Sequence, residues 1–240
     1  MHDSDTTKPV PARGPTRRVV AAAAVAVVSS AALVAGAPSA ARASTPSHPC
    51  ATTSTSTDWR SAATSANAAL SAALENLDNA QYAKAVEHLR IMKRKTRVAK
   101  KAATALVGRP PAPESDTPPG VPAVTRVAGL EHHITVTLVP LFRSPAGSHV
   151  VRPLNYGLTT AVVCRQRMLA KVIALPAAKR DDYSDNLADT LPDYRKELTA
   201  IDGELASEQL SAYSRTALQS TRIVVAATQV AMKKAFGGGE

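Results

Sequence analysis

Apolar residues recur at steps of three and four along nearly all of the chain after Thr57. This spacing places them on one face of an α-helix, which turns once every 3.6 residues. No stretch shows sustained strand alternation between hairpin turns. The pattern therefore predicts an all-α fold of about six helices in an antiparallel helical bundle. We call each such row of apolar residues a stripe, and the first stripe consists of Trp59, Ala63, Ala66, Leu70, Ala73 and Leu77.

Breaks between the stripes predict the domain organisation. A linker is expected where six prolines fall between Arg109 and Pro122, because such a segment is extended. It either separates two helical units or crosses one surface as a strap. The expected parts are a leader at 44–56, a basic helical hairpin at 57–108, the linker at 109–122, a helical bundle at 123–236 and a tail at 237–240.

Within the expected bundle, the stripes predict helices near residues 122–142, 154–175 and 207–236. A further helical region is expected over residues 183–205. Its apolar residues form a heptad-like seam, and Pro192 is expected to kink it.

The first 43 residues have the organisation of a cleavable export signal. A polar lead ends at Arg17-Arg18, an Ala-rich apolar run follows, and Ala41 and Ala43 favour cleavage before Ser44. The paired arginines are typical of twin-arginine export, but the residues after the pair do not fit that signal, so Sec export is equally compatible. An uncleaved anchor is the competing interpretation, since the run is close to the ~20 residues of a membrane span.

Two cysteines, Cys50 and Cys164, lie after the expected cleavage site. Export to an oxidising compartment makes a disulfide between them the expected state. The bridge would fasten the leader to the middle of the chain.

Glu131 and Arg165 are charged residues at positions that helical wheels place on buried faces. Glu131 lies among Val127, Ile134 and Leu138, and Arg165 lies at the centre of the next apolar face. In an antiparallel hairpin the two residues fall at the same level. We therefore predict a buried Glu131–Arg165 ion pair, which either fixes helix register or forms the floor of a ligand pocket.

The stretch "HLRIMKRKTRVAKK", residues 88–101, holds seven basic residues within twelve positions. The spacing places a row of them on one side of a helix: Arg90, Arg94, Arg97 and Lys101. Residues 44–110 carry a net charge of +6 and residues 111–240 only +1, so the excess belongs to this helix. Three interpretations compete, namely a solvated face partly opposite an acidic stripe at Asp181, Asp185 and Asp189, an anion-binding surface, and a nucleic-acid site. The last is disfavoured because the run has no stacking aromatic residue.

The chain contains no phosphate-binding loop, nucleophile elbow or paired-cysteine zinc motif, so no catalytic residue, metal ligand or cofactor is predicted. His132 and His133 are adjacent and point about 100° apart on a helix, so they do not chelate one ion together. They are expected to be surface or boundary residues.

These observations predict a secreted or cell-envelope-associated protein that is not an enzyme. It is expected to bind an anionic cell-wall polymer or membrane surface through its basic helix, without specific nucleic-acid recognition. The alternative is a small-ligand or metal-binding bundle with a pocket around Glu131 and Arg165. The Ala-, Arg- and Pro-rich composition is compatible with a high-GC actinobacterial source.

Overall fold

The computed structural model describes residues 50, 58–143 and 148–237. Every regular element in these ranges is helical, which confirms the predicted all-α bundle. The elements are α1 (Trp59–Asp78), α2 (Tyr82–Leu106), α3 (Gly120–Leu138), the 3-10 helix η1 (Val139–Arg143), α4 (Ser148–Ile173), α5 (Ala177–Asp181), α6 (Ser184–Ala188), α7 (Leu191–Leu205) and α8 (Ala212–Phe236).

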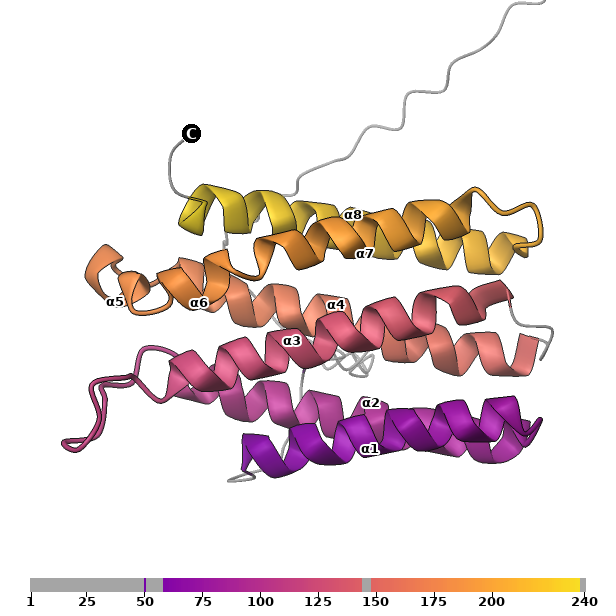
Figure 1. The fold of residues 1–240 in the computed structure, drawn as a ribbon, viewed down its shortest axis with the longest axis horizontal. Helices are drawn as coiled ribbons and strands as arrows, with labels where there is room; N and C mark the ends of the chain where they lie inside the picture. Colours follow the sequence, from indigo (N-terminus) through magenta and orange to yellow (C-terminus); the bar gives the residue numbers. More distant parts are fainter. Residues whose placement is uncertain (1–49, 51–57, 144–147, 238–240) are drawn as a thin grey trace, which may run out of the picture. The chain divides into compact units, whose positions relative to one another are not determined.

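The long helices of residues 44–240 pack as three hairpins in two layers (Figure 1). The hairpins are α1–α2, α3–α4 and α7–α8, and each contributes one helix to each layer. One layer contains α1, α3 and α7, and the other contains α2, α4 and α8. Because α3 and α4 lie in the middle, their charged side chains meet helices from both neighbouring hairpins.

The first hairpin forms where the sequence predicts it. Asp58 caps α1, and its side chain accepts a hydrogen bond from the Arg60 backbone N–H at 3.1 Å. The turn before α2 passes through Ala80, whose φ is 54°. After α2 the chain reaches Gly108 with φ 77°, a left-handed conformation that glycine adopts without steric cost and that ends the helix.

The second hairpin differs from the prediction at its loop end. The expected third helix becomes the 3-10 helix η1 at Val139, since Pro140 has no N–H to continue an α-helix. Helix α4 begins at Ser148, six residues before the expected start, and contains Pro153 within its first turns. The proline has no N–H to donate to the carbonyl of residue 149, so α4 lacks one intrahelical hydrogen bond near its start.

The helical region expected over residues 183–205 is two helices, α6 and α7, rather than one kinked helix, and the short helix α5 precedes them. Tyr183 lies in the turn between α5 and α6, fully buried, and its hydroxyl accepts a hydrogen bond from the Gly108 N–H at 3.2 Å. The break between α5 and α6 thus coincides with a ring that is buried in the core. Pro192 then lies in the first turn of α7, where proline favours a helix start and does not kink it.

One hydrophobic core runs through all three hairpins. Helix α2 packs on both α3 and α4, so the proline-rich segment links two helices of a shared core. Small buried residues such as Ala66, Ala73 and Ala85 let the helices of the first hairpin approach closely. Residues 44–240 form one compact unit. Within the described ranges no helix combines the length and apolarity needed to cross a bilayer.

The predicted disulfide is present, with Cys50 bonded to Cys164 and their Cα atoms 5.6 Å apart. It fastens residue 50 to the middle of α4, the central helix of its layer. The predicted export segment and the rest of the leader lie outside the described residues.

Candidate functional site

Glu131 and Arg165 are both buried, but their predicted pairing is wrong. The two residues are 0 % and 2 % exposed, as the helical wheels predict. Glu131 on α3 forms an ion pair with Lys100 of α2, whereas Arg165 on α4 forms one with Glu197 of α7. The reason is the layered arrangement, in which helices outside the α3–α4 hairpin supply an opposite charge to each residue. Two buried pairs therefore replace one.

Lys100 is only 3 % exposed although it belongs to the basic stretch. Its ammonium contacts Glu131 Oε1 and donates hydrogen bonds to the carbonyl oxygens of Thr160 (2.5 Å) and Ala161 (2.8 Å) on α4. Burial and the nearby charge of Arg165 lower the pKa of Lys100 well below its usual range, and the Glu131 carboxylate acts against both effects.

The Lys100–Glu131 contact is an ion pair without directed hydrogen-bond geometry. Neither carboxylate oxygen of Glu131 accepts a hydrogen bond within the described part of the chain. The carboxylate therefore depends on the Lys100 charge to offset its lost hydration.

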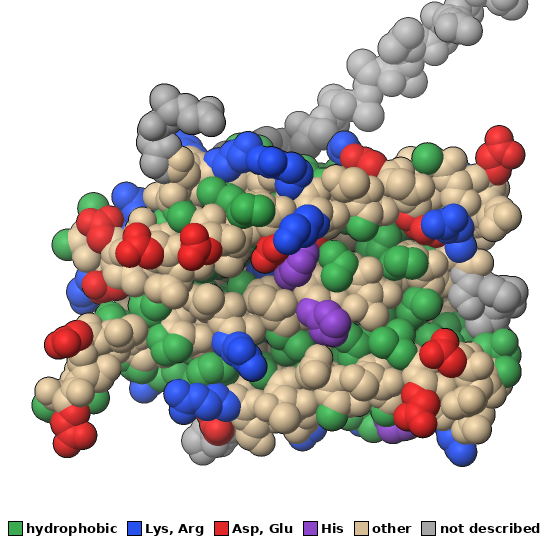
Figure 2. Space-filling view, viewed as in Figure 1, with side chains coloured by type: hydrophobic (Ala, Val, Ile, Leu, Met, Phe, Trp, Pro, Cys, Tyr) green, Lys and Arg blue, Asp and Glu red, His purple; other side chains and the backbone are tan. Residues whose placement is uncertain are grey.

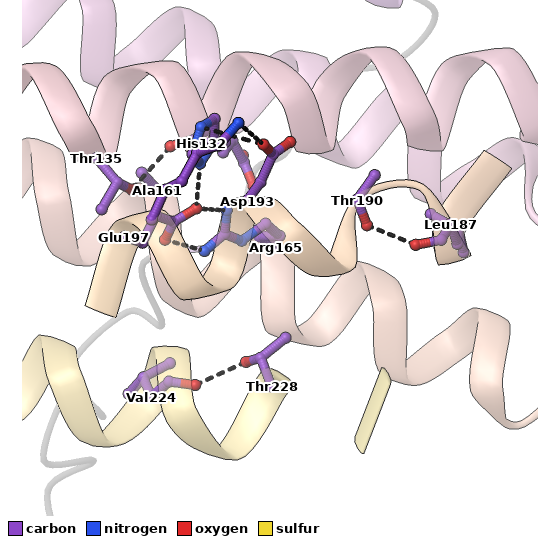
Figure 3. Close-up of polar contacts among 12 residues, drawn as sticks. His132, Thr135, Ala161, Arg165, Leu187, Thr190, Asp193, Glu197, Val224 and Thr228 are labelled. Atoms are coloured by element: carbon purple, nitrogen blue, oxygen red, sulfur yellow. Dashed lines mark hydrogen bonds and ion pairs between the residues drawn. The ribbon is translucent and has the colours of Figure 1, made fainter. Parts of the chain in front are cut away.

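The Arg165–Glu197 pair is better satisfied (Figure 3). The guanidinium donates to both carboxylate oxygens at 2.6 Å and lies over the Tyr194 ring at 4.8 Å. His132 Nδ1 lies 2.9 Å from Glu197 Oε1, and its Nε2 lies 3.6 Å from Asp193. Residues of α3, α4 and α7 thus converge in a connected network.

The pKa values of Glu197 and Tyr194 are shifted in opposite directions. Burial by itself opposes ionisation of Glu197, but the Arg165 charge, its hydrogen bonds and His132 hold the pKa of this carboxyl below its usual range. Burial raises the pKa of Tyr194 to about 12, although Arg165 acts against it. Glu197 is therefore a carboxylate and Tyr194 a neutral phenol at neutral pH.

We call the two buried pairs and His132 the buried charge layer: Lys100, Glu131, Arg165, Glu197 and His132. Its charges are matched by groups of the chain itself, which suits a role in fixing how the helices pack. His132 is partly buried within this layer, whereas His133 is exposed on the same helix. No group of three or more His, Cys, Asp or Glu side chains in the described residues has the arrangement of a metal site.

The predicted row of cations on α2 lies largely on the surface. Arg90, Arg94 and Lys101 are exposed, and Arg97 is half-buried. Glu87, one turn earlier, lies 3.7 Å from Arg90 and 3.6 Å from Arg94. We call these four cations the basic face.

The predicted acidic stripe does not form a continuous helix face. Asp181 ends α5, Asp185 lies in α6 and Asp189 follows it, because the turn at Tyr183 separates the two helices. The main neighbours of α6 are α3 and α8. Figure 2 shows acidic side chains gathered over the end of the molecule where α5 and α6 lie.

Beside the basic face lies a groove that the sequence did not reveal. Helix α2 contributes Arg90 and Lys93, and helix α4 contributes His149, Arg152 and Tyr156. Next to Tyr156, α2 and α4 approach closely at Gly157, where an added Cβ would lie 2.7 Å from Met92 Cε. The two helices are separated in sequence by α3, so only their packing brings these residues together.

Neither a scan against protein-family models nor searches of curated proteins and of solved structures found a match to this chain.

Proposed function

We propose that this protein is exported and acts outside the cytoplasm as a non-enzymatic binding protein, holding phosphate-bearing polyanions of the cell envelope on its basic face. The observation that carries the proposal is the exposure of Arg90, Arg94 and Lys101 on one helix, where Glu87 lies more than 3.5 Å from both Arg90 and Arg94. Exposed like charges in a row attract an anionic surface at distances up to the screening length.

Export is supported by two features of the chain. The first 43 residues have the polar lead, apolar run and small-residue exit of a cleavable signal. The Cys50–Cys164 disulfide is the kind of bond that persists in oxidising compartments.

The experiment measures retention of the full-length chain on phosphate-bearing wall polymer and on vesicles with anionic lipid, each at rising salt. The test variant is Arg90→Gln/Arg94→Gln. Its control is Arg126→Gln/Arg195→Gln, which removes the same charge from exposed positions of α3 and α7. A cation near an anionic surface contributes about 1 kcal/mol, so we expect the test variant to bind ~30-fold more weakly.

The polymer experiment and the vesicle experiment can each support or contradict the proposal. Retention that falls with salt and with the test variant, but not with the control, supports the proposal and shows which surface is bound. Equal losses for the two variants would mean that only net charge matters, and unchanged retention would mean that the basic face is merely solvated.

A further inference from the structure

The groove between α2 and α4 has a volume of about 330 Å³, within the range of small-ligand sites. Its cations are Arg90, Lys93 and Arg152, and none of the described residues that line it is acidic. It shares Arg90 with the basic face but differs from that row along one helix, because cations from two helices line one concave surface.

The positive charge of the groove is largely uncompensated. Arg152 has no ion pair within the described part of the chain, and Arg90 shares the Glu87 carboxylate with Arg94 at distances beyond 3.5 Å. Burial and the charge of Arg97 lower the pKa of Lys93. An anion placed here would relieve repulsion among these cations and accept hydrogen bonds from planar guanidinium groups, which match phosphate oxygens well.

An aromatic ring adds a second kind of contact. Tyr156 is 60 % exposed, an unusual position for a large ring, and the Lys93 ammonium lies 4.1 Å from its centroid. Next to it, Leu89 and Pro153 provide apolar surface in the groove. The groove also has two groups that can form hydrogen bonds with ligand hydroxyls, namely the His149 ring and the Tyr156 hydroxyl. The His149 ring packs edge-on against Tyr82, with ring centroids 5.9 Å apart.

From this combination we infer that the groove binds a phosphorylated sugar, with Arg90 and Arg152 on the phosphate and Tyr156 beside the sugar ring. The inference rests on the proposed function, because it names the repeating unit that a phosphate-bearing wall polymer would present. A phosphate alone would leave the exposed ring unused, and an uncharged sugar would leave the excess positive charge of the groove unneutralised.

Isothermal titration calorimetry on the full-length chain tests this with four probes: glucose 6-phosphate, inorganic phosphate, glucose and uridine monophosphate. We expect glucose 6-phosphate to bind about tenfold more tightly than inorganic phosphate, and glucose to give no measurable binding. Arg152→Gln should weaken glucose 6-phosphate binding tenfold or more. Tyr156→Ala should reduce it to the level of inorganic phosphate and leave inorganic phosphate unaffected.

Arg126→Gln is the matched control and should change neither affinity. Arg152 and Tyr156 are exposed, so thermal unfolding should show that their variants remain folded. Equal affinities for glucose 6-phosphate and inorganic phosphate, or an unchanged affinity after Arg152→Gln, would overturn the inference. A preference for uridine monophosphate would instead assign the groove to nucleotides.

The two proposals fail separately. If polymer retention depends on Arg90 and Arg94 while glucose 6-phosphate does not bind, the basic face stands and the groove assignment is wrong. If glucose 6-phosphate binds but polymer retention is unchanged in Arg90→Gln/Arg94→Gln, the groove stands as a small-ligand site and the polymer proposal is wrong.

Discussion

Lys100 and Lys101 are neighbours on α2, yet they belong to two regions with opposite electrostatic requirements. Lys100 enters the buried charge layer, where a carboxylate and two carbonyl oxygens replace its water. Lys101 lies on the exposed basic face, where solvent screens its charge. One amino-acid type therefore stabilises the fold in one region and is available for binding in the other. Burial and partner geometry, and not residue type, decide which role a charge has.

The largest expected effect is at Arg165 in the buried charge layer. Arg165→Met should lower the free energy of unfolding by about 3–5 kcal/mol, because it leaves the Glu197 carboxylate buried without its partner. Urea unfolding measures this change. A double-mutant cycle between Arg165 and Glu197 should show strong coupling, and a cycle between Arg165 and Glu131 should show far less. Equal coupling in the two cycles would contradict the observed pairing.

A second prediction compares the adjacent lysines directly. Lys100→Met should lower the free energy of unfolding by about 3 kcal/mol, since Glu131 then lacks its countercharge. Lys101→Met, the matched control, should change it by less than about 0.5 kcal/mol. Replacing both partners, as in Lys100→Met/Glu131→Leu, should restore much of the loss. If Lys100→Met and Lys101→Met lowered the free energy of unfolding by similar amounts, the contrast between a buried, stabilising lysine and an exposed one would be wrong.

Acid should weaken the buried charge layer and leave the basic face charged. The folded-state pKa of Glu197 is held below its unfolded value of about 4.3, so its contribution is complete above that pH. The contribution is lost as pH falls from about 5 through the folded pKa. Urea midpoints measured between pH 6 and pH 3 should therefore fall less steeply in Arg165→Met/Glu197→Leu than in the wild type. Parallel curves would show that this pair is not a source of acid sensitivity.

The smallest effect on stability is expected at Arg94 on the basic face. Arg94→Gln should change the free energy of unfolding by less than about 0.5 kcal/mol, as is usual for an exposed charge. Retention on anionic polymer should nevertheless fall about fivefold, in line with ~1 kcal/mol per cation. A large stability loss at Arg94 would place it with the buried residues.

The periodicity of apolar residues was sufficient to predict the all-α fold and the burial of Glu131 and Arg165. Their partners depend on contacts between hairpins, which intrahelical spacing does not encode. The same wheel argument could have found Lys100, eight residues after Met92 and three before Ala103 on the buried face of α2. It also applies to Glu197, between Tyr194 and Ile201 on α7.

The groove had no comparable signal. Arg152 and Tyr156 are four residues apart on α4, a spacing common to countless surface helices. They line a groove only because α4 packs beside α2 in the fold. In the sequence these two helices are separated by α3. The basic stretch has no aromatic residue of its own, and the ring beside it comes from Tyr156 of α4. The sequence of residues 88–101 alone therefore could not predict this ring.

The Cys50–Cys164 bridge also determines what a single backbone cut can achieve. Residues 109–117 are exposed between α2 and α3, and a protease acting there would separate the first hairpin from the rest of the polypeptide. Each fragment would carry one of the two sulfur atoms, so the pieces would migrate together on a gel until a reductant is added. The protein can thus be cut at this exposed connection and still keep its basic helix attached.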